Sequence, residues 1–405
     1  MIKQFTDSLS QKDKTLRQLY RFIYEYGPIS KVDLIDLTGL KQTTCTRLID
    51  ELLSHKLIFE AGFGESSGGR KPILYKIKPD TYYVFGIDIS RTYTKLLLMD
   101  LNLHLLKEER LSLNQTTTPD VIVAFLVSKI TELMEKKSLT KDLVLGIGIG
   151  SIGPLNRDDG ILLDPVDVPS PGWEKIPIKD MLEKQLGIDV FIDYGVNTAL
   201  LAEYQLTSFN MYQNIVYVIK GVGTRTGMIM DGNLTRGSDK LGRYGQGHMI
   251  INVHGKKCIC GSYGCVHAYS SIPAIVEEVI NLLKEGRDSI LRERVSQIEQ
   301  VHFDHICQAV NEGDPLCSQV IKDAAYYAGI GLSNVINVLH PELIILGGPT
   351  YTNMELFYET VKETALMKNK IMYPNHEIVI NRGNLGENAT SIGAGSLVLG
   401  HYLPN

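Results

Sequence analysis

Two segments of the chain share one strand–loop–strand pattern. The first, residues 83–102, consists of an apolar run, a polar loop and a second apolar run that ends in the turn Asp100-Leu101-Asn102. The second, residues 215–233, repeats this order and ends in Asp231-Gly232-Asn233. Short apolar runs bounded by turn residues are typical of buried strands. The repetition predicts a duplicated α/β architecture with two lobes and a cleft between them.

The first 80 residues have a different pattern, that of short helices followed by a hairpin. Apolar side chains recur at helical spacing over residues 16–23, and this helix is predicted to end at Gly27-Pro28. Ser30, with Asp33 three residues later, predicts the N-cap of a second helix. A third helix is predicted to bury Cys45, Leu48, Ile49, Leu52 and Leu53.

A tight turn at Gly39 is predicted to join the second and third helices, and two helices joined in this way form a helix-turn-helix motif. In such a motif the later helix, here the third, reads base edges with its first turns. Two further apolar segments, 57–59 and 73–77, flank a glycine-rich basic loop. This arrangement predicts a wing that approaches DNA phosphates and the minor groove. The predicted DNA-binding residues are Lys41, Gln42, Thr43, Thr46, Arg47, Arg70 and Lys71. The alternative is a three-helix bundle that mediates protein contacts.

Composition agrees with a soluble, multidomain protein. A chain of 405 residues is too long for one compact core, so two or three domains are expected. Residues 1–80 carry a net charge of +3, whereas the remainder carries −8, which permits nucleic-acid binding by the head but is weak evidence alone. The sequence shows neither a signal-peptide pattern nor an apolar run of the ~20 residues that a membrane helix needs, so we expect a cytoplasmic protein without membrane contact.

Three cysteines and one histidine are concentrated in a glycine-rich stretch. His248 is followed, after nine residues, by Cys258-Ile259-Cys260 and then by Cys265. Three thiolates and one imidazole satisfy a tetrahedral zinc ion and leave no open position, which predicts a structural Zn²⁺. Without a secretion signal this spacing favours a metal site over disulfides, and a redox-active dithiol is the alternative. Inert positions on helix faces are predicted for Cys45, Cys307 and Cys317.

The pattern H-x9-C-x-C-G-x2-G-C resembles the signature of the ROK family, which contains sugar kinases and sugar-responsive repressors. The segment from Leu16 to Pro72 also resembles the winged helix that ROK repressors carry and ROK kinases lack. The resemblance covers nearly all of residues 81–405 and implies a two-lobed, actin-like ATPase (ribonuclease H-like) fold. The implied domains are a winged helix-turn-helix at 1–80, a first lobe at 81–200 completed by a C-terminal helix at about 388–405, and a second lobe with the zinc site at 201–387.

Two phosphate-binding loops of the family are altered in this chain. The first, D-x-G-G-T in the kinases, corresponds to Asp88-Ile89-Ser90-Arg91-Thr92, where both glycines are missing. The second, G-x-G-x-G-x-G, keeps Gly221, Gly223 and Gly227 but has Arg225 at its third glycine. Because backbone N–H groups of such loops cradle the phosphates of ATP in kinases, these substitutions predict a damaged nucleotide site.

The position of the general base is also altered. Family kinases carry N-D-A-N, whose Asp takes the proton of the sugar hydroxyl, and the matching segment is Asp193-Tyr194-Gly195-Val196-Asn197. Gly195 has no side chain and cannot act as a base. Asp193 is the alternative base, provided that it lies within hydrogen-bond reach of the hydroxyl. The resemblance therefore implies a protein that has lost kinase activity and is not an enzyme.

The resemblance further implies that the sugar pocket contains Asn156, Asp167, Asp193, Asn197, His248 and His267. Two family carboxylates are replaced, because Gly245 stands at the Glu of E-x-G-H and His267 at the Glu of G-C-x-E. The loss of two hydrogen-bond acceptors predicts an altered specificity or a weaker affinity for sugars. For His267, three roles are open: donation to the ligand, competition for the metal, or a satisfied surface position.

Together these features predict a sugar-responsive transcriptional regulator, a repressor of carbohydrate-utilisation genes that a sugar ligand relieves. Its expected partners are operator DNA, a sugar or sugar derivative, and a further copy of the chain, since a winged helix usually reads a pseudo-palindromic site as a dimer. One alternative is an ATP-dependent sugar kinase with a regulatory DNA-binding head. Another is an adaptor whose head docks onto proteins.

Overall fold

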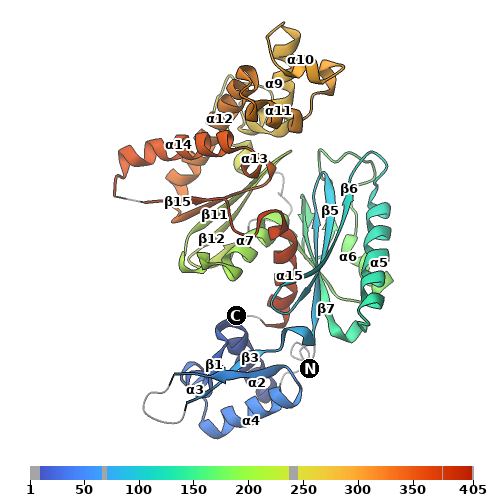
Figure 1. Ribbon diagram of the computed structural model, residues 1–405, viewed down its shortest axis with the longest axis vertical. Helices are drawn as coiled ribbons and strands as arrows, with labels where there is room; N and C mark the ends of the chain where they lie inside the picture. Colours follow the sequence, from blue (N-terminus) through green and yellow to red (C-terminus); the bar gives the residue numbers. More distant parts are fainter. Residues whose placement is uncertain (1–9, 66–70, 237–244, 376, 404–405) are drawn as a thin grey trace.

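The computed structural model describes residues 10–65, 71–236, 245–375 and 377–403. A small head at one end of the molecule precedes two α/β lobes, and the chain end at residue 403 returns to the head (Figure 1). Among the described residues, no helix is long and apolar enough to cross a membrane.

The head consists of three helices and a small antiparallel sheet. Its elements are α2 (Gln11–Tyr26), β1 (Ile29–Ser30), α3 (Lys31–Thr38), α4 (Gln42–Ser54), β2 (Ile58–Phe63) and β3 (Ile73–Ile77), and the strand order is β1-β3-β2. The predicted cap of the second helix is confirmed, because Ser30 and Asp33 form a reciprocal capping box. Gly39 ends α3 in the left-handed region at φ 66°, which glycine adopts without steric cost. The sequence gives no signal for β1, since a two-residue strand is too short for a hydrophobic period.

The first lobe is built on a five-stranded mixed sheet. Its strands are β4 (Tyr83–Ile89), β5 (Tyr93–Asp100), β6 (Leu105–Ser112), β7 (Val144–Ser151) and β10 (Val190–Tyr194), in the order β10-β7-β4-β5-β6. Helices α5 (Pro119–Lys136) and α6 (Ile178–Leu186) pack together on one face of this sheet (Figure 1). The short hairpin β8 (Leu155–Asn156) and β9 (Ile161–Leu162) follows β7. Trp173 is buried in the core of this lobe, where its Nε1 donates to Ser170 Oγ at 3.0 Å.

The second lobe repeats the topology of the first. Its strands are β11 (Ile215–Lys220), β12 (Thr224–Met230), β13 (Asn233–Thr235), β14 (Leu343–Gly347) and β15 (Val379–Asn381), in the order β13-β12-β11-β14-β15. If the strands are numbered by chain position within each five-stranded sheet, both sheets have the order 3-2-1-4-5. The prediction of a duplicated α/β architecture is therefore confirmed.

An extended helical layer completes the second lobe (Figure 1). Its helices are α8 (His267–Ser270), α9 (Ile272–Lys284), α10 (Leu291–Arg294), α11 (Phe303–Asn311), α12 (Pro315–Leu339), α13 (Pro349–Thr352) and α14 (Glu355–Met372). As predicted, Cys45, Cys307 and Cys317 lie on helices, here α4, α11 and α12, and their thiols are free.

Two helices, α7 (Gly195–Leu206) and α15 (Ala389–Tyr402), pack tightly against each other and against the first sheet. A Cβ placed on Gly148 of β7 would lie 1.7 Å from Ala394 O, and one on Gly393 would lie 1.7 Å from Thr198 O. Only glycine permits such close approach of two backbones. Because α7 spans residues 195–206, the proposed lobe boundary at residue 200 falls inside this helix.

The head shares one apolar core with the first lobe and with the end of α15. Buried side chains of the head, such as Leu19 and Ile77, belong to the same cluster as Val84 and Leu97 of the first sheet. Leu399 and Tyr402 near the end of α15 complete this cluster, and Tyr402 Oη donates to Leu145 O at 3.1 Å. Continuous apolar packing of this kind ties the orientation of the head to the position of α15.

Candidate metal centre, interlobe cleft and nucleic-acid interface

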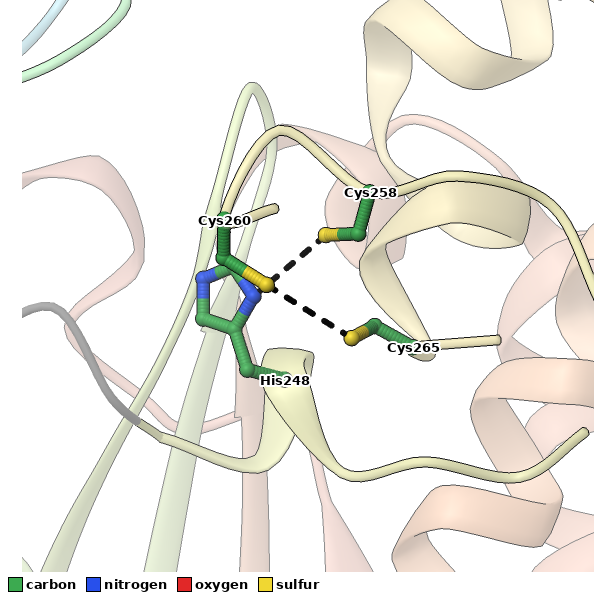
Figure 2. A group of neighbouring side chains, drawn as sticks. All are labelled: His248, Cys258, Cys260 and Cys265. Atoms are coloured by element: carbon green, nitrogen blue, oxygen red, sulfur yellow. Dashed lines mark hydrogen bonds between the residues drawn. The ribbon is translucent and has the colours of Figure 1, made fainter. Parts of the chain in front are cut away.

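The four predicted metal ligands converge on one point. His248 follows β13 in a single 3₁₀ turn (Gln246–His248), and the three cysteines come from the loop that precedes α8. Their ligand atoms all lie within 4.8 Å of one another (Figure 2). Within the cluster, Cys258 Sγ lies 3.5 Å from His248 Nδ1 and Cys260 Sγ lies 3.8 Å from Cys265 Sγ.

These spacings suit tetrahedral coordination. With Zn–S bonds of about 2.3 Å and Zn–N bonds of about 2.0 Å, the edges of a tetrahedron are about 3.8 Å between two sulfurs and about 3.5 Å between sulfur and nitrogen. Cys258 and Cys265 are buried, while Cys260 is exposed at the loop tip. Burial and the crowding of the neighbouring sulfurs raise the pKa of the Cys265 thiol to about 12. A divalent cation would supply the positive charge that such a group of thiolates needs.

The loop that carries the cysteines depends on two glycines. Gly261 and Gly264 have φ values of 90° and 71°, which favour glycine. At Gly264 a Cβ would also lie 1.6 Å from Asn252 O. An isolated antiparallel β-bridge pairs Ile250 with Cys265 at the end of this loop. The glycines of the C-x-C-G-x2-G-C pattern therefore shape the ligand loop.

A cavity of about 570 Å³ lies between the two lobes. The first lobe contributes the β4–β5 turn and the end of β7, and the second contributes the β11–β12 turn and Gly348-Pro349. The start of α15 closes one side through residues such as Ala389 and Thr390. A cleft of this size at a lobe interface is a typical small-molecule site.

Two positions of the kinase pattern, the carboxylate Asp88 and the altered base position Gly195, both line this cavity. Asp88 is buried and accepts a hydrogen bond from Tyr93 Oη at 2.9 Å. Burial raises the pKa of its carboxyl to about 7, and the Tyr93 hydrogen bond and Lys95 oppose this shift. Gly195 begins α7, and its position offers the cavity no side chain.

The alternative base, Asp193, is already engaged by its own neighbours. The residue is buried, and Oδ1 accepts from Tyr194 N at 2.7 Å and from Asn197 Nδ2 at 2.8 Å. Oδ2 forms an ion pair with Arg236 Nε at 3.0 Å. A carboxylate whose two oxygens accept these bonds has little capacity left to take a proton from a ligand.

The predicted sugar residues form two pairs and two separate positions. Asp193 and Asn197 are hydrogen-bonded to each other, and the rings of His248 and His267 stack at 5.5 Å. Asp167 is exposed, has a φ of 59° and exerts an electrostatic influence on His248. Asn156 donates through Nδ2 to Asp159 at 2.6 Å in the β8–β9 hairpin, and none of its described contacts joins it to the other five. Their common role in sugar binding stays a prediction.

The surface position considered for His267 is wrong. His267 is only 6% exposed, and it lies outside the set of four ligand atoms that surround the candidate metal position. Burial, followed by the nearby Lys220 ammonium and His248, lowers its pKa to about 3. The imidazole is therefore neutral at physiological pH and can both donate and accept a hydrogen bond.

Two buried ionisable residues of the body, Lys220 and Glu203, were missed by sequence reasoning. Lys220 ends β11 and donates to Thr224 Oγ1 at 3.1 Å and Ser270 Oγ at 2.8 Å, and burial lowers its pKa to about 7. Glu203 on α7 accepts from the backbone N–H groups of Asn384 and Leu385, each at 2.9 Å, and thereby holds the segment that leads into α15. The only signal for Lys220 is a charged residue at the end of an apolar run, directly before a glycine.

The head presents a polar helix end to solvent. Lys41, Gln42, Thr43 and Arg47 are exposed at the start of α4, opposite the buried face formed by Cys45 and Leu48. The Thr46 hydroxyl donates to Gln42 O at 2.9 Å, so it is partly used by the helix itself. Lys71 is exposed beside the wing, and Arg70 lies outside the described residues. The DNA-binding role of this set stays a prediction.

Comparisons with known proteins agree with this architecture. The protein-family model described as "ROK family" matches residues 84–401. The xylose repressor of Caldicellulosiruptor bescii is 28% identical over 399 residues, which are 98% of this chain and 97% of that protein. The crystal structure of a ROK family transcriptional regulator, described as a homolog of the E. coli MLC protein, has a TM-score of 0.78 at 24% identity and covers 97% of both chains.

A ROK family glucokinase from Streptomyces griseus, in complex with glucose and AMPPNP, has a TM-score of 0.66 at 23% identity. This match covers 98% of the glucokinase but 78% of the present chain. The expected two-lobed fold is thus confirmed by both kinds of structure, whereas the regulator matches nearly the full length. Because its family model spans most of both lobes, this chain belongs to the ROK family.

Proposed function

We propose that this protein is a sugar-responsive transcriptional repressor without kinase activity. The observation that carries the proposal is the combination of a winged helix-turn-helix head with a two-lobed body whose kinase positions are altered. Full-length similarity to a protein named xylose repressor supports the repressor rather than the kinase. At the position of the kinases' general base this chain has Gly195, which carries no side chain. The alternative base, Asp193, already forms an ion pair with Arg236 and a hydrogen bond with Asn197.

The signal would pass from the cleft to the head through α15. The beginning of this helix lines the cavity, and its last turn packs in the core that the head shares with the first lobe. Lys95 Nζ donates to Asn388 Oδ1 at 2.8 Å and so attaches the start of α15 to the first sheet. A ligand that binds the DNA-incompetent arrangement more tightly, by about 1–3 kcal/mol, would weaken operator binding by a population shift.

DNase footprinting of the region upstream of the protein's own gene tests the proposed function. We expect protection of a pseudo-palindromic site whose half-sites are about one helical turn, or a multiple of it, apart, because two heads of a homodimer would read it. An ATP-dependent phosphorylation assay over hexoses and pentoses should give no turnover. A missing footprint together with sugar phosphorylation that Asp193→Ala abolishes would support the kinase alternative instead.

A structural zinc ion would be held by His248, Cys258, Cys260 and Cys265, and it would supply a cross-link between the 3₁₀ turn and the cysteine loop. We expect Cys265→Ala to lose bound zinc and to lower the melting temperature, since a closed four-ligand site contributes directly to folding. Metal analysis of purified protein measures the first effect and thermal unfolding the second.

Cys307→Ala is the matched control, because this thiol lies on α11 outside the cluster. It should keep one zinc ion per chain. Wild-type protein purified without chelators that contains no stoichiometric zinc, or Cys265→Ala protein that retains it, would contradict the metal assignment.

A further inference from the structure

The side chain of Arg91 connects two distant loops of the first lobe. Arg91 lies in the turn between β4 and β5, and it lines the interlobe cavity. Its Nε donates a hydrogen bond to the backbone carbonyl of Val166 at 2.9 Å, although 75 positions separate the two residues in the sequence. Arg91 is 9% exposed, so its guanidinium is packed in place. The kinase pattern has glycine at this position, and a glycine could not make this contact.

The turn that carries Arg91 is held by its own hydrogen bonds. Ser90 Oγ accepts from the backbone N–H groups of Thr92 at 3.2 Å and of Tyr93 at 3.0 Å. The backbone N–H of Ser90 donates in return to Tyr93 O at 2.9 Å. A serine that hydrogen-bonds to its own turn restricts the backbone there. The side chain of Arg91 therefore starts from an ordered base.

The loop that accepts the Arg91 hydrogen bond, residues 163–170, is anchored at both of its ends. At its start, the backbone N–H of Leu163 donates to Pro154 O at 3.0 Å. At its end, Ser170 Oγ is buried and donates to Thr117 O at 2.6 Å. These two anchors fix where the loop begins and ends, but they do not reach its tip.

The tip of this loop is the turn at Val166 and Asp167, and both residues are exposed. Asp167 has a φ of 59°, which is in the left-handed region that residues other than glycine rarely adopt. A backbone conformation of this kind persists where surrounding contacts fix it. The hydrogen bond from Arg91 to Val166 O is such a contact, because it is made directly next to Asp167.

Charge attraction acts on the same turn. Burial, followed by the charge of Arg225, lowers the pKa of Arg91 to about 10, and Asp167 opposes this shift. The guanidinium of Arg91 is therefore protonated at neutral pH and attracts the Asp167 carboxylate. Asp167 also influences Arg225 and His248, which places it on the side of the loop that faces the cleft. Among the described residues, no hydrogen bond or ion pair occupies the carboxylate, so its oxygens can accept hydrogen bonds from a ligand.

We propose that Arg91 is a positioning residue of the sugar site, which fixes the Val166–Asp167 turn so that the Asp167 carboxylate meets the effector. This inference rests on the proposed function and assigns Arg91 a part in it. Arg91 acts through the turn, and the group that contacts the sugar is Asp167. A carboxylate that is in place before binding raises the affinity, because the ligand does not have to order the turn.

A double-mutant cycle on the sugar response of the full-length protein tests this role. Operator binding by wild type is measured by fluorescence anisotropy with the common aldopentoses, aldohexoses and N-acetylhexosamines, and the most effective of these sugars is used for all variants. Asp167→Asn, which suits the left-handed backbone, should raise the half-effective sugar concentration about tenfold, since a charged acceptor is lost. Arg91→Met, which removes the donors but keeps an apolar stem, should raise it by a similar factor.

The double variant Arg91→Met/Asp167→Asn distinguishes positioning from direct contact with the sugar. If Arg91 acts through Asp167, the double variant should respond within about twofold of Asp167→Asn alone, because the same group is already disabled. Independent contributions would instead multiply to about 100-fold. Arg91→Lys keeps the charge and a donor, so its response should lie between those of wild type and Arg91→Met.

Arg292→Met is the matched control. Arg292 Nε also donates to a backbone carbonyl, that of Arg287 at 2.9 Å, but Arg292 lies on α10 and does not line the cavity. Its replacement should change the half-effective sugar concentration by less than about twofold. Melting temperatures show whether each variant is folded, and Arg91→Lys takes the place of Arg91→Met in the cycle if the latter does not fold.

An Arg91→Met protein that responds to sugar like wild type, or losses that multiply in the double variant, would overturn the role of Arg91 and leave the repressor function intact. Wild-type protein that does not bind its operator, or whose operator binding no sugar weakens, would refute the sugar-responsive repressor and this inference with it.

Discussion

Gly393→Ala is expected to destabilise the protein by about 3 kcal/mol, at the upper end of the usual range for overpacked cores. Its new Cβ would lie 1.7 Å from Thr198 O and 2.3 Å from Thr198 C, both of which belong to the backbone of α7. A flexible side chain could move aside, but a helix backbone cannot shift without separating α15 from α7. Thermal unfolding followed by circular dichroism should show a clearly lower melting temperature.

Gly400→Ala provides a control in the same helix. Gly400 is exposed in α15, and no atom lies within 4 Å of a Cβ placed there. Replacing a glycine inside a helix by alanine at an open position should stabilise the protein by about 0.5–1 kcal/mol. If the two variants unfold at the same temperature, the close packing of α15 against α7 is not a property of the protein in solution.

The second large effect is expected at the head. The double variant Gln42→Ala/Arg47→Ala should bind operator DNA at least about 100-fold more weakly, because each base contact that is lost costs about 1–3 kcal/mol. Both side chains are exposed at the start of α4, so their removal should leave the fold and the melting temperature unchanged. Fluorescence anisotropy with labelled operator DNA measures the affinity, and a salt series separates base contacts from phosphate contacts.

Arg21→Ala is the corresponding control on α2. It also removes a positive charge from the head, but Arg21 is ion-paired with Glu25 at 2.8 Å and lies on α2, not on α4, the proposed recognition helix. Surface pairs of this kind contribute little, so operator affinity should fall by less than about threefold. Equal losses in the two proteins would show that the head binds DNA only through its overall charge, or that α4 is not the recognition helix.

Much of the fold could be predicted because its signals are local. The capping box at Ser30 and the turn at Gly39 reflect backbone preferences that do not depend on distant residues. The paired strand–loop–strand units also predicted the duplicated sheets correctly. In contrast, the two-residue strand β1 exists only because β3 is available to pair with it, and no local pattern indicates that.

The candidate site was predictable to a different degree in its parts. The four candidate metal ligands are close in sequence and chemically distinctive, so their convergence was expected, and their side chains do lie together. The burial of His267 and Lys220, and the pairing of Asp193 with Arg236, depend on contacts between distant segments. The proximity of Arg91 and Arg225, which both line the interlobe cavity, also depends on contacts between distant segments. In the sequence 134 positions separate them, and the arrangement of the two lobes brings both guanidinium groups close to Gly223.

The central claim is that a ligand in the interlobe cleft controls DNA binding by the head. Its most direct test is fluorescence anisotropy of the full-length protein on DNA from upstream of its own gene, at one stated salt concentration, titrated with neutral and phosphorylated sugars. The account predicts specific binding that one of these ligands weakens. Affinity no higher than that for unrelated DNA, and unchanged by every ligand, would contradict it.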